Sequence, residues 1–265
     1  SLKTGREADM KEALEWFDIV KPHFFRAPLD NDKGFGNWIA KDWKNNRLDS
    51  PETATVKPLD AKRNADGTVT VTTTQECRYA NGKITTDYVY TMDADGSVDF
   101  SATYTPEGQL PPLPCIGNTF LMDKDMTRLS WYGQGLQDSY VDRLEATGIG
   151  RWTSSVDQEY VHYPRPQSSG NHEQTVTLSL TDAKGRGYTV TTANATPFAF
   201  SALPYSEHQL STVAHDCDLH TENNVFLNID AAMMGLGNSS CGPGVLTKYS
   251  IPQKQHSLHV MFKRK

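Results

Sequence analysis

The residues best suited to chemistry lie in the stretch Trp131–Arg143, which reads W-Y-G-Q-G-L-Q-D-S-Y-V-D-R. Three aromatic side chains stand there beside two glycines, two aspartates and one arginine. Aromatic rings offer flat apolar faces, whereas carboxylate and guanidinium groups offer hydrogen bonds and charge. That mixture suits a sugar, which has apolar ring faces and hydroxyl edges. The alternative interpretation is a twisted strand with a glycine bulge and buried aromatic side chains.

A second candidate is the loop at residues 22–32, which contains two prolines and an Asp-Asn-Asp run. The side chains of Asp30, Asn31 and Asp32 could either ligate a cation or form a hydrogen-bonded polar corner. The D-x-D-x-D-G spacing of a calcium-binding loop is absent, so we predict the polar corner and no metal. Arg26 is expected to pair with Asp30 or Asp32 and to hold this corner.

Composition limits the classes of protein. The formal net charge of -6 and the pI of about 5.7 argue against nucleic acid or an anionic membrane as the main partner. No apolar run approaches the roughly 20 residues that a membrane-spanning helix needs. The first residues contain neither a start methionine nor a signal peptide, which indicates an excised piece and leaves the compartment unknown. Four scattered cysteines lack a C-x-x-C pair, so free thiols are favoured over zinc ligation, with two disulfides as the alternative.

The elements that position these residues are mostly strands. Thr- and Val-rich runs at 68–74, 84–92 and 98–104 are separated by Asn-Gly and Asp-Gly pairs, which predicts an antiparallel meander. Residues 7–20 begin with helix formers and end in a run that favours a strand from Trp16. Further strands are predicted at 116–122, 128–132, 175–180, 187–192, 225–229, 249–251 and 257–262, and short helices at 36–47 and 206–210. No repeat or linker divides the chain, so residues 1–265 are predicted to form one all-β domain, a large antiparallel β-sandwich.

Four stretches together resemble the C-terminal domain, or small chain, of the family-two glycoside hydrolase β-galactosidases. They are residues 25–32 (F-R-A-P-L-D-N-D), Trp131–Arg143, 161–172 (V-H-Y-P-R-P-Q-S-S-G-N-H) and 227–241 (L-N-I-D-A-A-M-M-G-L-G-N-S-S-C). The resemblance extends from about residue 24 to residue 262. It implies a supersandwich of the galactose mutarotase-like kind, in agreement with the predicted hairpins.

The resemblance also implies a role. Retaining hydrolases of this kind use a pair of carboxylates, and in this family both glutamates belong to a separate β/α-barrel domain. The chain is therefore expected to carry no catalytic residue. It would complete the galactoside cleft and the assembly of an oligomeric parent that hydrolyses terminal β-D-galactosides. The resemblance implies no cofactor in this domain, and Mg and Na sites outside it.

The family lends a tryptophan to the cleft from a glycine-rich loop after an M-G-x-G motif. Here that motif is Met234–Gly237, and the matching position is Cys241, which cannot provide an aromatic face. The loop is then expected to contact the substrate through neighbouring polar groups, or else to be only a tight turn. The predicted substrate contacts are Arg26, Asp30, Asn31, Asp32, Asn238, Ser239, Ser240, Cys241 and Gly242.

Three charged positions of the family are also replaced. The usual Arg, Glu and second Arg correspond here to Cys115, Ser168 and Val176. Removing one member of a buried set of ions leaves the other charges buried without a partner. We therefore expect the three positions to lie together and to have changed together. Such a change would put the usual substrate preference of the family in doubt.

Two other functions remain open. The chain could be a free-standing carbohydrate-binding module. It could also be an aldose 1-epimerase, which needs a histidine acid and a carboxylate base across one sugar ring. Candidate pairs for that chemistry are His172 with Glu173, and His215 with Glu222 or Asp230.

Overall fold

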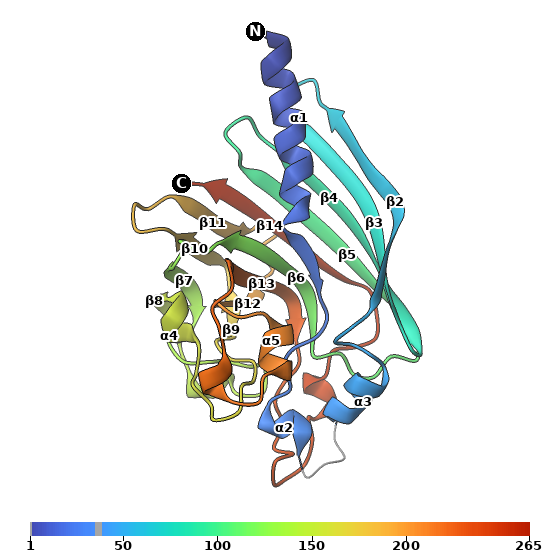
Figure 1. Cartoon of the computed structure of the whole chain (residues 1–265), viewed down its shortest axis with the longest axis vertical. Coiled ribbons are helices and arrows are strands. Elements are labelled where there is room, and N and C mark those ends of the chain that lie inside the picture. The colour runs from blue at the N-terminus through green and yellow to red at the C-terminus, as the bar shows by residue number, and fades with distance from the viewer. Residues whose placement is uncertain (1, 35–38) are drawn as a thin grey trace.

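The computed structural model describes residues 2–34 and 39–265, with side chains from Met10 onward. Its strands form two antiparallel sheets, which confirms the predicted all-β architecture (Figure 1). The smaller sheet has the order β1 (Val20–His23), β6 (Cys115–Asp123), β13 (Asn224–Met233), β12 (Phe198–Leu203) and β9 (His172–Thr175). The larger sheet has the order β2 (Glu52–Arg63), β3 (Val69–Tyr79), β4 (Gly82–Met92), β5 (Val98–Gly108), β14 (His256–Arg264), β11 (Gly187–Thr192), β10 (Thr177–Thr181), β7 (Arg128–Gln134) and β8 (Ile149–Ser155).

The predicted meander is confirmed as strands β3 to β5, and β2, which was not predicted as a strand, extends it. Their turns close at Arg63 opposite Val69, Tyr79 opposite Gly82, and Met92 opposite Val98. Asp-Gly pairs occupy the first and third turns, where Gly67 and Gly96 have positive φ, whereas the turn between β3 and β4 is Ala80-Asn81 and Gly82 is the first residue of β4. The predicted hairpin of β10 and β11 is also confirmed, and its strands lie between β7 and β14.

The core lies between the two sheets and is closed by the helix α1 (Leu2–Asp18). Trp16 packs at its centre, with its ring centroid 5.1 to 5.8 Å from those of Tyr90, Phe100, Phe120 and Phe262. The prediction of a strand from Trp16 is wrong, since the chain stays helical to Asp18 and β1 begins only at Val20. Ala13, Trp16 and Phe17 are three and four residues apart, so a helix turns all three toward the core.

The remaining helices are short. They are α2 (Asp30–Lys33), α3 (Ile39–Asn45), α4 (Val156–Glu159) and α5 (Glu207–Thr212), with 3-10 turns η1 (Leu144–Ala146), η2 (Asp216–Asp218) and η3 (Thr247–Tyr249). The helix predicted at 36–47 is present as α3, although residues 36–38 lie outside the described part of the chain. The helix predicted at 206–210 is present as α5.

One predicted strand is wrong, and several strands were not predicted, among them β2, β8 and the fully buried β12. Residues 249–251 do not form a strand, because Tyr249 ends η3 and its carbonyl accepts the Gly235 N–H at 3.0 Å. The run F-A-F-S-A-L of β12 is buried at every position, so it lacks the alternation that marks a strand with one exposed face.

The four cysteines are free thiols, as favoured from their spacing. Cys77 and Cys115 are buried, whereas Cys217 and Cys241 are exposed. Among the described residues, no helix has the length and apolar character needed to cross a bilayer.

Candidate functional site

The centre of the candidate site is Arg26, whose side chain is fully buried after β1. Its guanidinium donates to both carboxylate oxygens of Asp32, from Nε at 3.1 Å and from Nη2 at 2.8 Å. The opposite edge of the group donates to the carbonyls of Met234 at 3.0 Å and Gly235 at 3.4 Å. Arg26 therefore joins the polar corner to the glycine-rich loop, which we define as residues 233–244.

Two aromatic rings enclose this guanidinium. Its Cζ lies 5.8 Å from the ring centroid of Trp43 and 5.7 Å from that of Tyr140. A planar guanidinium that is enclosed by rings and paired on two edges has no donor left to face solvent. Arg26 and Asp32 are therefore positioning residues, and the prediction that they contact substrate directly does not fit their burial.

The end of the central stretch Trp131–Arg143 supports the same loop from the other side. The Asp142 carboxylate accepts the backbone N–H groups of Leu236 at 3.0 Å and Gly237 at 2.8 Å. An added Cβ at Gly235 would lie 2.8 Å from the Asp142 carboxyl carbon, so only glycine admits this approach. Arg143 donates to the Gly237 carbonyl at 2.6 Å and to Asn238 Oδ1 at 3.2 Å.

The polar corner contacts the loop through Asn31 as well. Its amide donates to the Gly237 carbonyl at 2.8 Å, and its Oδ1 accepts from the Ser240 hydroxyl at 2.7 Å. Asp30 has an exposed side chain, and its backbone N–H donates to Gln167 Oε1 at 2.8 Å. The segment 161–172 is thus attached to the corner too.

The tip of the loop is a tight turn. The N–H groups of Cys241 and Gly242 both donate to the Asn238 carbonyl, at 3.0 and 2.6 Å. Asn238, Ser240 and Cys241 are exposed, whereas Ser239 is buried and cannot present its hydroxyl to a ligand. The structure therefore leaves Asp30, Asn31, Asn238, Ser240 and Cys241 as the accessible members of the predicted set, with Gly242 half-buried beside them.

The profile of the family described as "Beta galactosidase small chain" matches residues 1–262. The chain belongs to the β-galactosidase small-chain family. The β-galactosidase of Streptococcus thermophilus is 32% identical over 218 residues, which are 82% of this chain and 21% of that protein. The β-galactosidase BgaC of Bifidobacterium adolescentis is 35% identical over 186 residues, or 68% of this chain and 17% of that protein.

This small-chain domain spans about a fifth of the length of the curated relatives it matches. Among solved structures, a GalM/aldose epimerase homologue from C. elegans aligns over 78% of this chain and 68% of its own, with 11% identity and a TM-score of 0.35. A TM-score this low does not support a conclusion about the function of the chain.

The three replaced positions have separate partners. Ser168 donates to Glu207 Oε1 at 3.0 Å, and Cys115 Sγ lies 3.8 Å from His23 Nε2. Burial raises the pKa of Cys115 to about 11, and the carboxylates of Asp230 and Glu207 add to this effect. Val176 is the bend between β9 and β10, with backbone hydrogen bonds to Tyr132 and Thr192. No hydrogen bond of the described residues joins these positions to one another, so the structure does not support the expectation that all three lie together.

The pairs proposed for epimerase chemistry are not formed. His172 is fully buried and its Nε2 contacts Glu159 at 2.6 Å, not Glu173. Asp230 pairs with His23 rather than with His215. His172 also packs against the Trp131 ring, 4.3 Å between centroids, which makes both core residues.

Sequence reasoning missed Asp142 as a positioning residue. Its signal was its place beside Arg143 at the end of the central stretch, where a carboxylate can receive the backbone N–H groups of a glycine-rich turn. The guanidinium of Arg143 in turn reaches Gly237 and Asn238 in the loop.

Proposed function

We propose that this chain is the accessory small-chain domain of a larger β-galactosidase and that its glycine-rich loop completes the substrate cleft. One observation carries the proposal. The four stretches that identify the family come from distant parts of the sequence, yet hydrogen bonds join all four around the loop. A network of this kind pre-organises an exposed loop tip, which is how binding loops gain affinity.

The accessible groups at the loop tip have the chemistry for hydroxyl recognition. The Asn238 amide and Ser240 hydroxyl can each donate and accept, as sugar hydroxyls do. The catalytic acid and base, the retaining mechanism and the oligomeric assembly belong in this proposal to the rest of the parent enzyme. The isolated chain is accordingly proposed to be inactive toward galactosides.

A region exchange tests the proposal. The matching region of the Streptococcus thermophilus relative is replaced by this chain, and hydrolysis of o-nitrophenyl β-D-galactoside is compared with that of the relative lacking the region. We expect the deletion to be inactive, the isolated chain to be inactive, and the chimera to recover turnover. Turnover by the isolated chain, or a folded chimera no more active than the deletion, would refute the proposal.

A substitution then tests the role of the loop. Cys241→Trp places an aromatic ring at the exposed tip, where it can cover a sugar face. Aromatic contacts of this type contribute about 0.5–1.5 kcal/mol. The KM of the chimera for the galactoside should therefore fall about two- to tenfold. Cys217→Trp, at the other exposed thiol, is the matched control and should leave KM unchanged. An equal effect of both variants would exclude the loop from the cleft.

A further inference from the structure

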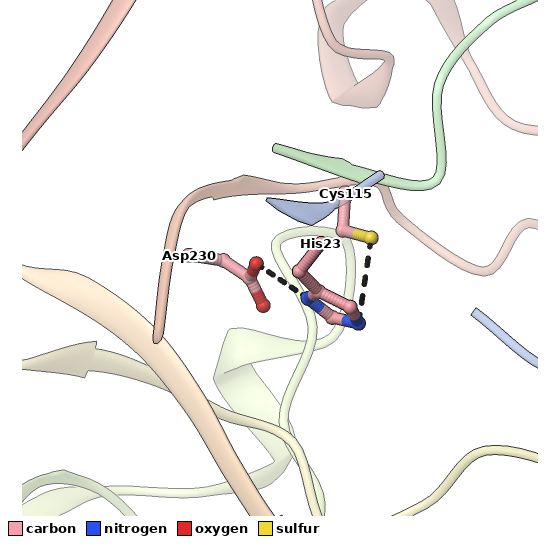
Figure 2. A group of neighbouring side chains, drawn as sticks. All are labelled: His23, Cys115 and Asp230. Carbon is pink, nitrogen blue, oxygen red and sulfur yellow. Dashed lines mark hydrogen bonds and ion pairs between the residues drawn. The ribbon is translucent and has the colours of Figure 1, made fainter. Parts of the chain in front are cut away.

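Three side chains with metal-ligand chemistry meet in the smaller sheet (Figure 2). His23 lies on β1, Cys115 on β6 and Asp230 on β13, which are neighbouring strands. His23 Nδ1 is 2.7 Å from Asp230 Oδ1, and His23 Nε2 is 3.8 Å from Cys115 Sγ. All three are buried, and one ligand atom from each lies within 4.8 Å of the other two.

The sheet leaves room for this group through one glycine. His23 and Asp230 both stand opposite Gly117 of β6, on its two sides. A Cβ at Gly117 would collide with Asp230 Oδ1. The missing side chain lets the imidazole and the carboxylate meet across the intervening strand, and Cys115, two residues before Gly117, projects from the same face of the sheet.

The protein alone does not satisfy these groups. Asp230 Oδ2 is buried and has no hydrogen-bond partner. A buried carboxylate and a buried thiol therefore flank one imidazole, and one carboxylate oxygen is left without a donor. A buried acceptor without a partner favours the binding of a cation beside it.

We propose that this cluster, which we call the His23–Cys115–Asp230 site, binds a divalent cation of the zinc type. Thiolate and imidazole together suit zinc or cobalt rather than magnesium or calcium. Zinc lies about 2.3 Å from sulfur and about 2.0–2.1 Å from nitrogen, so two such ligands stand about 3.5–3.8 Å apart at tetrahedral to trigonal angles. The 3.8 Å between Cys115 Sγ and His23 Nε2 fits that separation.

The same geometry assigns a different role to each residue. Cys115 Sγ and His23 Nε2 face each other and are the direct ligands, while Asp230 holds Nδ1 on the far side of the ring. A carboxylate in that position fixes the ring and strengthens its ligating nitrogen. A cavity of about 310 Å³, lined by His23 and Glu207, provides an entry path and space for a water ligand.

The Asp-His-Cys chain also resembles an activated thiol nucleophile, but Cys115 is completely buried, so no substrate can reach its sulfur. The cysteine spacing gave no hint of zinc, because the ligands come from three separate strands.

Cobalt uptake tests the proposal on the purified chain after treatment with a chelator. Cys217→Ser/Cys241→Ser serves as the background, because its exposed thiols are removed. We expect a thiolate-to-cobalt absorption band that saturates at one equivalent of Co²⁺ and disappears when Zn²⁺ is added. Cys115→Ser in this background should lose the band, whereas Cys77→Ser, which removes the other buried thiol, should keep it. Asp230→Asn should keep the band but weaken cobalt affinity about 10- to 100-fold.

Circular dichroism establishes that each variant is folded. Should Cys115→Ser fail to fold, native mass spectrometry of the background chain decides instead, by the presence or absence of one bound zinc per chain. A folded chain without a cobalt band and without bound zinc would overturn the proposal. A band retained in folded Cys115→Ser would overturn it as well.

Discussion

Replacing Arg26 by methionine should destabilise the chain more than any surface change. The substitution keeps an apolar stem of similar length but removes the guanidinium, which donates two hydrogen bonds to Asp32 and two to carbonyls of the loop. The Asp32 carboxylate would then be buried without a countercharge. Removing one partner of a buried ion pair costs about 3–5 kcal/mol, and we expect the free energy of unfolding to fall by that amount.

The double variant Arg26→Met/Asp32→Asn distinguishes the energetic cost of the unpaired Asp32 charge from the cost of the lost hydrogen bonds. Asparagine keeps an oxygen for the Leu29 N–H, which now donates to Asp32 Oδ2 at 3.0 Å. The double variant should therefore recover about 2 kcal/mol relative to Arg26→Met. Urea unfolding followed by tryptophan fluorescence measures both values, and limited proteolysis reports whether the loop loosens.

Two results would refute this reasoning. The first is a loss below about 1 kcal/mol for Arg26→Met, which is the range of exposed ion pairs. The second is a double variant that loses the sum of both single losses, since additivity would mean that the two side chains are energetically independent.

Three further perturbations test other parts of the structure. Burial raises the pKa of Glu173 in the folded chain to about 8, above its unfolded value of about 4.3. The resulting stabilisation is fully present below about pH 4.3 and is lost as the pH rises to 8, so the free energy of unfolding should fall by up to about 5 kcal/mol across that window. Glu173→Gln should remove this dependence of stability on pH. Ser206→Ala removes the hydroxyl that accepts the Gln209 N–H at 3.2 Å and should cost about 1 kcal/mol in urea unfolding, with Ser257→Ala, an exposed serine on β14, as a neutral control. Gly117→Ala would drive a methyl group into Asp230 and should lower Tm by several degrees, whereas Gly148→Ala, which meets nothing within 4 Å, should not.

The sequence allowed prediction where local chemistry decides the structure. The meander follows from alternating side chains and Asn-Gly or Asp-Gly turns, because both signals act between residues close in the chain. Helix α1 was mistaken at its end because aromatic residues favour strands on average, while Trp16 gains more from filling the space between the sheets.

In the candidate site too, a contact between residues close in the chain was predicted and a contact between distant residues was not. A pair of Arg26 with Asp30 or Asp32 was predicted, because the partners are close in the chain and the prolines fix the turn, and the structure selects Asp32. The contact between His23 and Asp230 spans 207 residues and exists only because β6 brings a glycine between them. A pairing set by strand order and register cannot be read from residue spacing.

The outer edge of the larger sheet has a consequence for self-association. Strand β2 is paired only with β3, and the other side of its backbone is free of any described strand. Edges of this kind recruit strands from other molecules and start aggregation. Here the register shifts twice between Thr55 and Asp60, and Pro58 lacks an N–H to donate. The edge at β2 is thereby protected against strand addition, so this side of the sheet is not expected to recruit a strand from another molecule.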